Sequence, residues 1–574
     1  MGSDAASPGN PPGRRARPDN ANRPDDADNA DGPDVSTRPG ADHLSTQRRN
    51  LLFGLGLGVV NVAVLRRLGI ARDVEAAPSS STASAPLPST ITPSGPVVAT
   101  PAVPVEEITL PPPLDGAPGQ PPQGHRFQLA ITGGRVIDPD SRFDGLANVG
   151  IDDGVITAIT TETLQAETII DATDRVVAPG FIDLLSYEPN PFGVWLKLAD
   201  GVTTNLAMHG VNNYAAAFFR RYENVTPIHF GGAFHHHFLR GFDVAADIGD
   251  ELSSLQLSSL EALVRSNLAQ GFAGLSFSPE YSPGTTTDEM VQLAGLGASR
   301  GHVSFFHVRH SDPNPPGTSI EAIDEVLNIA RSTGAAVHIE HLTSTGGTFV
   351  MAQALERLNQ ARAEGVDVTA CIYPYDFWGT ALGSTRFAPG WQERYGLSEG
   401  DLQVAGTSTR LTPETFAVAV RNNTLVAALG SIPEEEVRLA LAEPWMLVGS
   451  DAIITASQNN HPRGAGTFAR TLGRYVRELG VLNLMDALAK LTILPARRVE
   501  SMIPAMGAKG RVQRGADADL VVFDPVTIAD QATVEEPSLP STGIDHVLVA
   551  GQHALRDGTP DRSVVAGTAL RGRF

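Results

Sequence analysis

The sequence predicts an α/β protein: a (β/α)8 barrel that carries a small β-sandwich domain formed by the segments on its N- and C-terminal sides. Two observations predict this fold. Short apolar strands alternate with helical stretches over about 300 residues, a pattern typical of parallel barrels. The stretches on either side of that region contain only strand-like runs. We therefore expect one barrel, with both flanks joined in a second domain.

The flanks supply the predicted β-sandwich. Residues 127–138 alternate in polarity and then turn, which predicts a strand pair, and 149–159 form a hairpin around Asp153-Gly154. Three further strand-like runs follow near the C-terminus: 510–512, 518–524 and 546–551. We expect residues 126–178 and 498–574 to form the β-sandwich domain and residues 179–497 to form the barrel.

Helices are expected between the barrel strands. The clearest helical stretches are Ser319–Ser332, Thr348–Glu364 and Ala465–Leu479. This architecture is shared by enzymes of many kinds, so it does not by itself indicate a chemistry.

Composition excludes several function classes. The chain has 574 residues and a formal net charge of −21. An acidic balance argues against nucleic acid or an anionic membrane surface as the main partner, because such binders usually carry a basic surface. The only cysteine, Cys371, excludes an internal disulfide framework and a multi-cysteine metal site.

The first part of the chain has a different character. Residues 1–47 are rich in Pro, Asp, Asn and Gly, and Arg48-Arg49 then precede an apolar segment at 51–65, an arrangement that resembles a twin-arginine export signal. We therefore expect 1–76 to be a disordered region plus signal, and 77–125 a disordered Pro/Ser/Thr linker.

Export by the twin-arginine machinery would place the protein in the periplasm, outside the cell or on its surface. The alternative is a membrane anchor formed by 51–65. As a helix this segment would span only about 22 Å, which is short of the roughly 30 Å hydrocarbon core.

Four polar residues end apolar runs within the predicted barrel: His209, His307, His341 and Asp451. Barrel enzymes carry their reactive groups at the C-terminal ends of their strands. Three neutral imidazoles can hold a zinc ion and leave a fourth position for water, and a nearby carboxylate can accept a proton from that water. The spacing therefore indicates a catalytic zinc site.

Several ordered blocks resemble a known family. They are Val177–Asp183, Asp200–Thr204, Gly274–Ser276, Tyr281–Gly284, Tyr373–Tyr375, His461–Arg463 and Gly515–Asp524. Together they make residues 127–574 similar to the amidohydrolase superfamily, and to its D-aminoacylase (N-acyl-D-amino-acid deacylase) branch in particular.

The resemblance implies roles for individual residues. His307 and His341 match metal ligands, and Asp451 matches the general base that follows the eighth strand. His209 stands where this branch usually has a cysteine ligand, and we interpret it as a conservative exchange. Substrate contacts are implied for four further residues: Arg463, Tyr281 and Tyr375, which would bind a substrate carboxylate, and His236 near the site.

Two departures from the family pattern matter. The superfamily has His-x-His after its first strand, whereas this chain has Leu185 and Tyr187 at those positions, so we expect one zinc ion per chain. Thr343 stands where lysine is common, which leaves the preference for D- or L-amino acids open.

The sequence therefore predicts an exported zinc-dependent hydrolase of non-peptide C–N bonds. Its expected substrate is a small amide with a carboxylate, most simply an N-acyl-D-amino acid. Two alternatives remain open: a cyclic-amide hydrolase of the hydantoinase or dihydroorotase type, and a binding protein that has lost catalysis together with the His-x-His pair.

Overall fold

The computed structural model describes residues 118–452 and 461–574. The export signal, the 51–65 segment and nearly all of the linker predicted from the sequence lie outside the described residues. Among the described residues, no helix is both long and apolar enough to cross a membrane.

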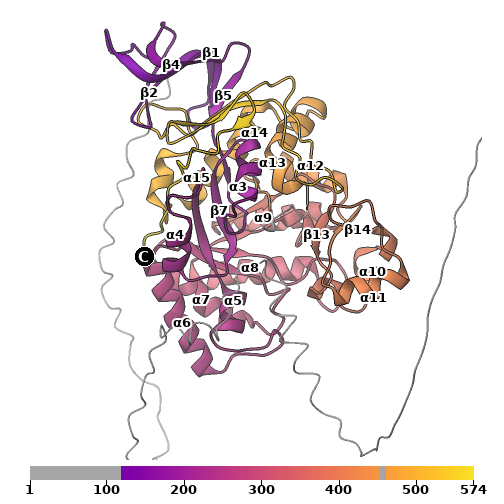
Figure 1. Cartoon of the computed structure of the whole chain (residues 1–574). Coiled ribbons are helices and arrows are strands. Elements are labelled where there is room, and N and C mark those ends of the chain that lie inside the picture. The colour runs from indigo at the N-terminus through magenta and orange to yellow at the C-terminus, as the bar shows by residue number, and fades with distance from the viewer. Residues whose placement is uncertain (1–117, 453–460) are drawn as a thin grey trace, which may run out of the picture. The chain divides into compact units, whose positions relative to one another are not determined.

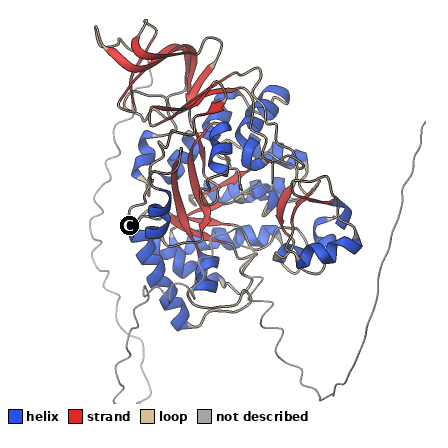
Figure 2. Cartoon of the chain, in the orientation of Figure 1, coloured by secondary structure: helices blue, strands red, loops and turns tan. Residues whose placement is uncertain are grey.

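Eight parallel strands form the barrel at the centre of the molecule, surrounded by helices (Figures 1 and 2). In sheet order the strands are β16 (Leu447–Val448), β12 (Val368–Ile372), β11 (Ala336–Ile339), β10 (Val303–Phe306), β9 (Gly274–Phe277), β8 (His229–His235), β7 (Val202–Val211) and β6 (Phe181–Asp183). The two end strands approach each other where Asp451 N donates to the Leu185 carbonyl at 2.8 Å, so the barrel is nearly closed. All ten residues of β7 are buried, as expected for a parallel strand covered on both faces. The predicted barrel is confirmed.

The barrel helices follow the apolar periodicity of the sequence. They are α3 (Gly193–Ala199), α4 (Ala215–Tyr222), α5 (His236–Phe242), α6 (Ser254–Ala269), α7 (Thr287–Ala298), α8 (Ser319–Thr333), α9 (Met351–Ala363), α12 (Glu434–Ala442), α13 (Arg463–Arg470), α14 (Leu484–Leu491) and α15 (Ile493–Val499). In α8 a capping box between Thr318 and Glu321 begins the helix, and Gly334, with a positive φ of 69°, ends it. The helix predicted at 465–479 is α13 followed by a π-helical stretch, Thr471–Glu478.

A nine-stranded sheet above the barrel in Figure 1 joins the two flanks of the chain. Its strands are β1 (Arg126–Asp138), β2 (Phe143–Asp152), β3 (Val155–Thr160), β4 (Gln165–Asp171), β5 (Val176–Pro179), β17 (Leu520–Phe523), β18 (Ile544–Val549), β19 (Gln552–Arg556) and β20 (Thr559–Pro560). β5 pairs with β17, so the contact between the flanks is a direct strand pairing. The predicted hairpin at Asp153-Gly154 is confirmed, since β2 and β3 are antiparallel and both turn residues have positive φ.

The strand pair predicted at 127–138 is wrong. These residues belong to β1, one bent strand of 13 residues, with a register shift against β2 between Ile131 and Gly134. Gly133 has φ of +75°, so the glycines at 133–134 form a bulge that bends the strand without reversing it.

Two segments were not anticipated from the sequence. Between β12 and β16 the chain forms an insertion, at the right of Figure 1, with β13 (Trp378–Ala381), α10 (Trp391–Tyr395), β14 (Leu402–Val404), α11 (Pro413–Arg421) and β15 (Leu425–Ala428). The last residues leave the nine-stranded sheet and lie against the barrel instead. There, Phe230 at the start of β8 donates to Thr568 and accepts from Leu570.

Candidate metal centre and active site

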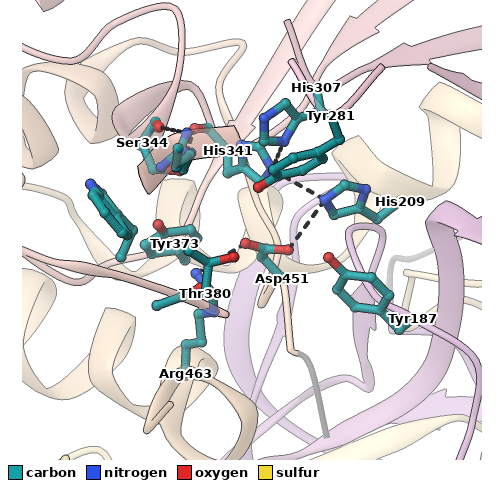
Figure 3. Close-up of a pocket in the computed structure, with 13 residues that line it drawn as sticks. Tyr187, His209, Tyr281, His307, His341, Ser344, Tyr373, Thr380, Asp451 and Arg463 are labelled. Carbon is teal, nitrogen blue, oxygen red and sulfur yellow. Dashed lines mark hydrogen bonds and ion pairs between the residues drawn. The ribbon is translucent and has the colours of Figure 1, made fainter. Parts of the chain in front are cut away.

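The four polar residues predicted from the sequence lie together at one end of the barrel (Figure 3). His209 is near the end of β7, and His307 directly follows β10. His341 and Asp451 follow β11 and β16. All four are buried, with 2–5% of their surface exposed. Because the strands are parallel, their C-terminal ends meet at this mouth of the barrel.

The imidazole nitrogens of the three histidines face one another. Nδ1 of His307 lies 3.1 Å from Nε2 of His341, which in turn lies 3.4 Å from Nε2 of His209. Two nitrogens held at about 2.0–2.1 Å from one zinc ion, at the tetrahedral angle, lie about 3.3–3.4 Å apart. The two separations are close to this value, and all the potential ligand atoms of the group lie within 4.8 Å of one another, so the site can accept a tetrahedral zinc ion.

The protonation states also suit a metal ion. Burial, followed by the charge of His307, lowers the pKa of His209 to about 3, and burial lowers the pKa of His341 well below its usual value. Neutral imidazoles offer a lone pair to a metal. Three lone pairs pointed at one another repel unless a cation lies between them, so the donor set fits zinc.

Backbone strain accompanies the site. His341 has φ of +27° and Asp451 has φ of +49°, values that side-chain-bearing residues rarely adopt. Each such residue costs on the order of 1–3 kcal/mol and persists where the surrounding structure holds it. At His341 this conformation breaks the strand alternation, so Glu340 and His341 both reach the group of potential metal ligands.

Asp451 lies between the histidines and an arginine. Its Oδ1 is 3.7 Å from Nε2 of His209, and its Oδ2 pairs with Nη1 of Arg463 at 3.0 Å. Burial raises the pKa of Asp451 to about 6, although Arg463 and Arg386 act in the opposite direction. A carboxylate in this position can accept a proton from a water held among the histidines.

Comparisons with known proteins agree with this geometry. The chain is 32% identical over 467 residues to N-acyl-D-glutamate deacylase of Alcaligenes xylosoxydans xylosoxydans, covering 74% of this chain and 93% of that protein. It belongs to the D-aminoacylase branch of the amidohydrolase superfamily. It is therefore a hydrolase of C–N bonds other than peptide bonds.

Further comparisons point to the same branch. The family described as "Amidohydrolase family" matches residues 405–554. D-aminoacylase of the same Alcaligenes is 28% identical over 74% of this chain and 94% of its own length. A crystal structure of N-acyl-D-glutamate deacylase from Bordetella bronchiseptica, complexed with zinc and a phosphonate inhibitor, matches with a TM-score of 0.67 at 28% identity and covers 78% of this chain and 100% of that one.

The pocket of this amidohydrolase contains most of the residues predicted from the sequence. Its lining consists of Tyr187, His209, Tyr281, His307, His341, Ser344, Tyr373, Trp378, Gly379, Thr380, Arg386, Asp451 and Arg463. Tyr281 packs on His307, with ring centroids 4.5 Å apart. Nε of Arg463 is buried and has no hydrogen-bond partner among the described residues.

The structure places two of the predicted substrate contacts elsewhere. The His236 ring is buried outside the pocket at the start of α5, where its Nε2 is 2.6 Å from Glu289 in α7. Tyr375 lines a neighbouring cavity beneath the guanidinium of Arg470. Tyr373, two residues earlier, lines the pocket instead, with Arg463 stacked 4.6 Å above its ring.

The positions of the missing His-x-His pair offer no obvious metal ligand. Leu185 is buried among apolar side chains inside the barrel. Tyr187 lines the pocket and packs against His209, with ring centroids 4.8 Å apart. Thr343 is buried in the 3-10 turn Leu342–Ser344 that follows His341.

Sequence reasoning missed three residues with ionisable side chains at the site. Glu340 lies with Oε2 3.2 Å from Nδ1 of His209, on the edge of that ring opposite the other histidines. Burial, together with Asp451, raises the pKa of Glu340 well above its usual value. His338 and Glu340 are two residues apart at the end of β11, so strand alternation puts them on the same face. This spacing could have predicted that Glu340 faces the inside of the barrel.

The other two are Glu280 and Arg386. Glu280, shortly after β9, has Oε2 2.5 Å from Nε2 of His307 and 3.1 Å from Nε of Arg386. Burial would raise the pKa of Glu280, but Arg386 and His307 outweigh it and lower that pKa to about 2. Arg386 belongs to the insertion, in the 3-10 turn Thr385–Phe387, and no pattern in the sequence connected it with the barrel strands.

Proposed function

We propose that this protein is an exported zinc-dependent deacylase of N-acyl-D-amino acids that holds one zinc ion per chain. His209, His307 and His341 would be the ligands and Asp451 the general base. The observation that carries the proposal is the separation of the three imidazole nitrogens, 3.1 Å and 3.4 Å, with a buried carboxylate beside them. The names of the relatives supply the substrate class.

Each side chain has a defined task in this reaction. A zinc ion bound by the histidines would polarise the amide carbonyl and activate the attacking water. Asp451 takes a proton from the water and delivers it to the leaving amine. The position of Asp451 suits both steps, because its Oδ1 lies 3.7 Å from Nε2 of His209 and can reach a water held among the histidines.

Arg463 would bind the substrate carboxylate. Nη1 of Arg463 holds Asp451, whereas its buried Nε lacks a partner among the described residues. A buried donor without an acceptor costs about 1–3 kcal/mol, and a bound carboxylate would remove that cost. The same contact would keep the amide close to Asp451 and the histidines.

Metal content and substrate preference test the proposal together. Purified protein should contain one zinc ion per chain and release amino acid from N-acyl-D-glutamate, N-acyl-D-aspartate or neutral N-acyl-D-amino acids. The matching N-acyl-L-amino acids and cyclic imides serve as comparison substrates. Hydrolysis confined to cyclic imides would favour a cyclic-amide hydrolase, and a protein with neither zinc nor hydrolysis would overturn the proposal.

Export rests on the sequence around Arg48-Arg49. Replacing both arginines by lysine should retain the folded enzyme in the cytoplasm, because the paired arginines are the distinctive feature of this signal. Cell fractionation followed by an activity assay measures this. Unchanged export of the double variant would contradict it.

A further inference from the structure

The outer edge of the His307 ring is held by a single carboxylate. Nε2 of His307 lies 2.5 Å from Oε2 of Glu280, while Nδ1 on the other edge faces His341. A neutral imidazole carries one proton. If that proton lies on Nε2 and is donated to Glu280, the lone pair of Nδ1 points into the cluster of histidines.

We propose that Glu280 is the positioning residue for the metal ligand His307, and that Arg386 of the insertion holds Glu280 in place. This inference rests on the proposed function, because it assumes that His307 binds zinc through Nδ1. It adds a role for the insertion: through Glu280, Arg386 controls the orientation of the ligand His307.

The insertion supplies three contacts to Glu280. Nε of Arg386 is 3.1 Å from Oε2, and the hydroxyl of Tyr395 in α10 is 3.4 Å from Oε1. Thr385 donates through Oγ1 to the Glu280 carbonyl at 2.8 Å. Side chain and backbone of Glu280 are thus both tied to the segment that covers the pocket.

Arg386 is itself held firmly. It is 3% exposed and donates through Nη2 to Oγ of Ser311, at 3.0 Å, and to the carbonyl of Ser344. Ser344 belongs to the turn that follows His341. Arg386 therefore joins the loops after two ligand-bearing strands, β10 and β11, to Glu280 in the loop after β9.

His307 is held more completely than the other two histidines. Nδ1 of His341 has no hydrogen-bond partner among the described residues, and Nδ1 of His209 lies 3.2 Å from Glu340 without the geometry of a hydrogen bond. Loss of the Glu280 contact would therefore remove the strongest orienting interaction in the ligand set.

The chain contains a matched control outside the pocket. His236, Glu289 and Arg240 repeat the same arrangement: Nε2 of the histidine is 2.6 Å from Glu289, which also pairs with Arg240. These side chains are buried as well, Glu289 somewhat more deeply than Glu280, and they do not line the pocket. Glu289→Gln therefore reproduces the loss of a buried carboxylate between a histidine and an arginine.

The test measures zinc affinity directly. Apo protein is titrated with zinc in competition with a chromophoric chelator, for wild type, Glu280→Gln and Glu289→Gln. Glu280→Gln should bind zinc about 10- to 100-fold more weakly, the usual effect of altering the partner of a ligating histidine, because an amide oxygen accepts from Nε2–H of His307 more weakly than a carboxylate and leaves Arg386 without its counter-charge. Glu289→Gln should bind zinc as wild type does, whatever its thermal stability.

Substitution of zinc by cobalt gives a second measurement, the visible absorption spectrum of the bound ion, which a general loss of protein stability does not change. The visible absorption of bound Co(II) reports the ligand geometry, so Glu280→Gln should change its position or intensity and Glu289→Gln should leave it unchanged. If Glu280→Gln does not fold, Glu280→Asp replaces it in both measurements. That variant keeps the charge on a shorter side chain and should bind zinc more weakly than wild type.

The outcomes separate this inference from the proposed function. A wild-type protein that binds no zinc overturns the proposed function. A wild-type protein that binds one zinc ion, together with Glu280 variants of unchanged affinity and cobalt spectrum, overturns the role of Glu280 alone. Equal losses in the Glu280 and Glu289 variants also overturn it, because they would reflect a general effect of removing a buried charge.

Discussion

The barrel has a buried polar cluster at each end: one around the three histidines of the pocket, at the end we call the mouth, and one around His229, at the end we call the floor. The two clusters differ in how completely their polar atoms are paired. At the floor, His229 begins β8, with Nδ1 2.8 Å from Thr568 and Nε2 3.0 Å from Asp519. Asp519 also pairs with Lys509 at 2.7 Å and accepts from the amide of Ala550. At the mouth, by contrast, His341 Nδ1, Asp451 Oδ1 and Arg463 Nε have no hydrogen-bond partners among the described residues.

The floor cluster is therefore complete within the protein, whereas the polar atoms at the mouth remain available to a ligand. At the floor, the carboxylate of Asp519 is paired with His229 and Lys509. Burial would raise the pKa of Asp519, but these two partners outweigh it and lower that pKa far below its usual value. The mouth keeps neutral imidazoles and a carboxylate of raised pKa. Buried polar groups that the protein does not pair are costly unless a ligand pairs them.

The largest effect should come from removing a ligand at the mouth. His341→Ala leaves two imidazoles, too few for a stable zinc site, so zinc content should fall from about one ion per chain to near zero, with loss of activity. Metal analysis after gel filtration measures this. His229→Ala at the floor is the control: it should retain zinc, and zinc loss in both variants would remove the distinction between the two ends.

Asp451→Asn separates chemistry from metal binding at the mouth. The amide cannot accept the proton, so kcat should fall about 10²- to 10⁴-fold. Zinc content should stay near that of wild type, because the three imidazoles remain. Steady-state kinetics and metal analysis on the same preparation test this, and retained turnover would rule out Asp451 as the base.

Lys509→Met probes the floor. The substitution leaves the buried Asp519 without its cation, which should cost about 3–5 kcal/mol of the free energy of unfolding. Zinc affinity and kcat should not change, because Lys509 lies at the opposite end of the barrel from the pocket. Denaturant unfolding gives the stability, and a loss of zinc affinity would show that the two ends are coupled.

Arg463→Lys should have the smallest effect. Lysine keeps the charge but loses the planar, bidentate geometry that suits a carboxylate, so kcat/KM should fall about 10- to 100-fold. The loss should be larger for substrates with a free α-carboxylate than for their methyl esters, which lose only the effect of the contact between Arg463 and Asp451. Equal losses for both substrates would contradict a direct contact.

The sequence predicted the barrel and the four central residues because each of them ends an apolar run, a pattern that depends only on neighbouring residues. Glu280 and Arg386 could not be found in the same way, since their contact joins positions 106 residues apart and depends on how the insertion folds. Within the motif Tyr373–Tyr375 the family resemblance points to Tyr375, whereas Tyr373 lines the pocket. Strand alternation would put both side chains on one face, but the strand ends at Ile372, so the backbone of the loop that follows decides which of the two lines the pocket.

The pairing of β5 with β17, and of Phe230 with residues 568–570, has a consequence for synthesis. A nascent chain that has emerged only as far as the end of the barrel still exposes an open β5 edge and an uncovered start of β8. Closing contacts over more than 300 residues of sequence is slow relative to local helix formation. Segments synthesised late thus complete domains that were begun much earlier. We therefore expect chaperones to bind the ribosome-bound intermediate at its unpaired sheet edge.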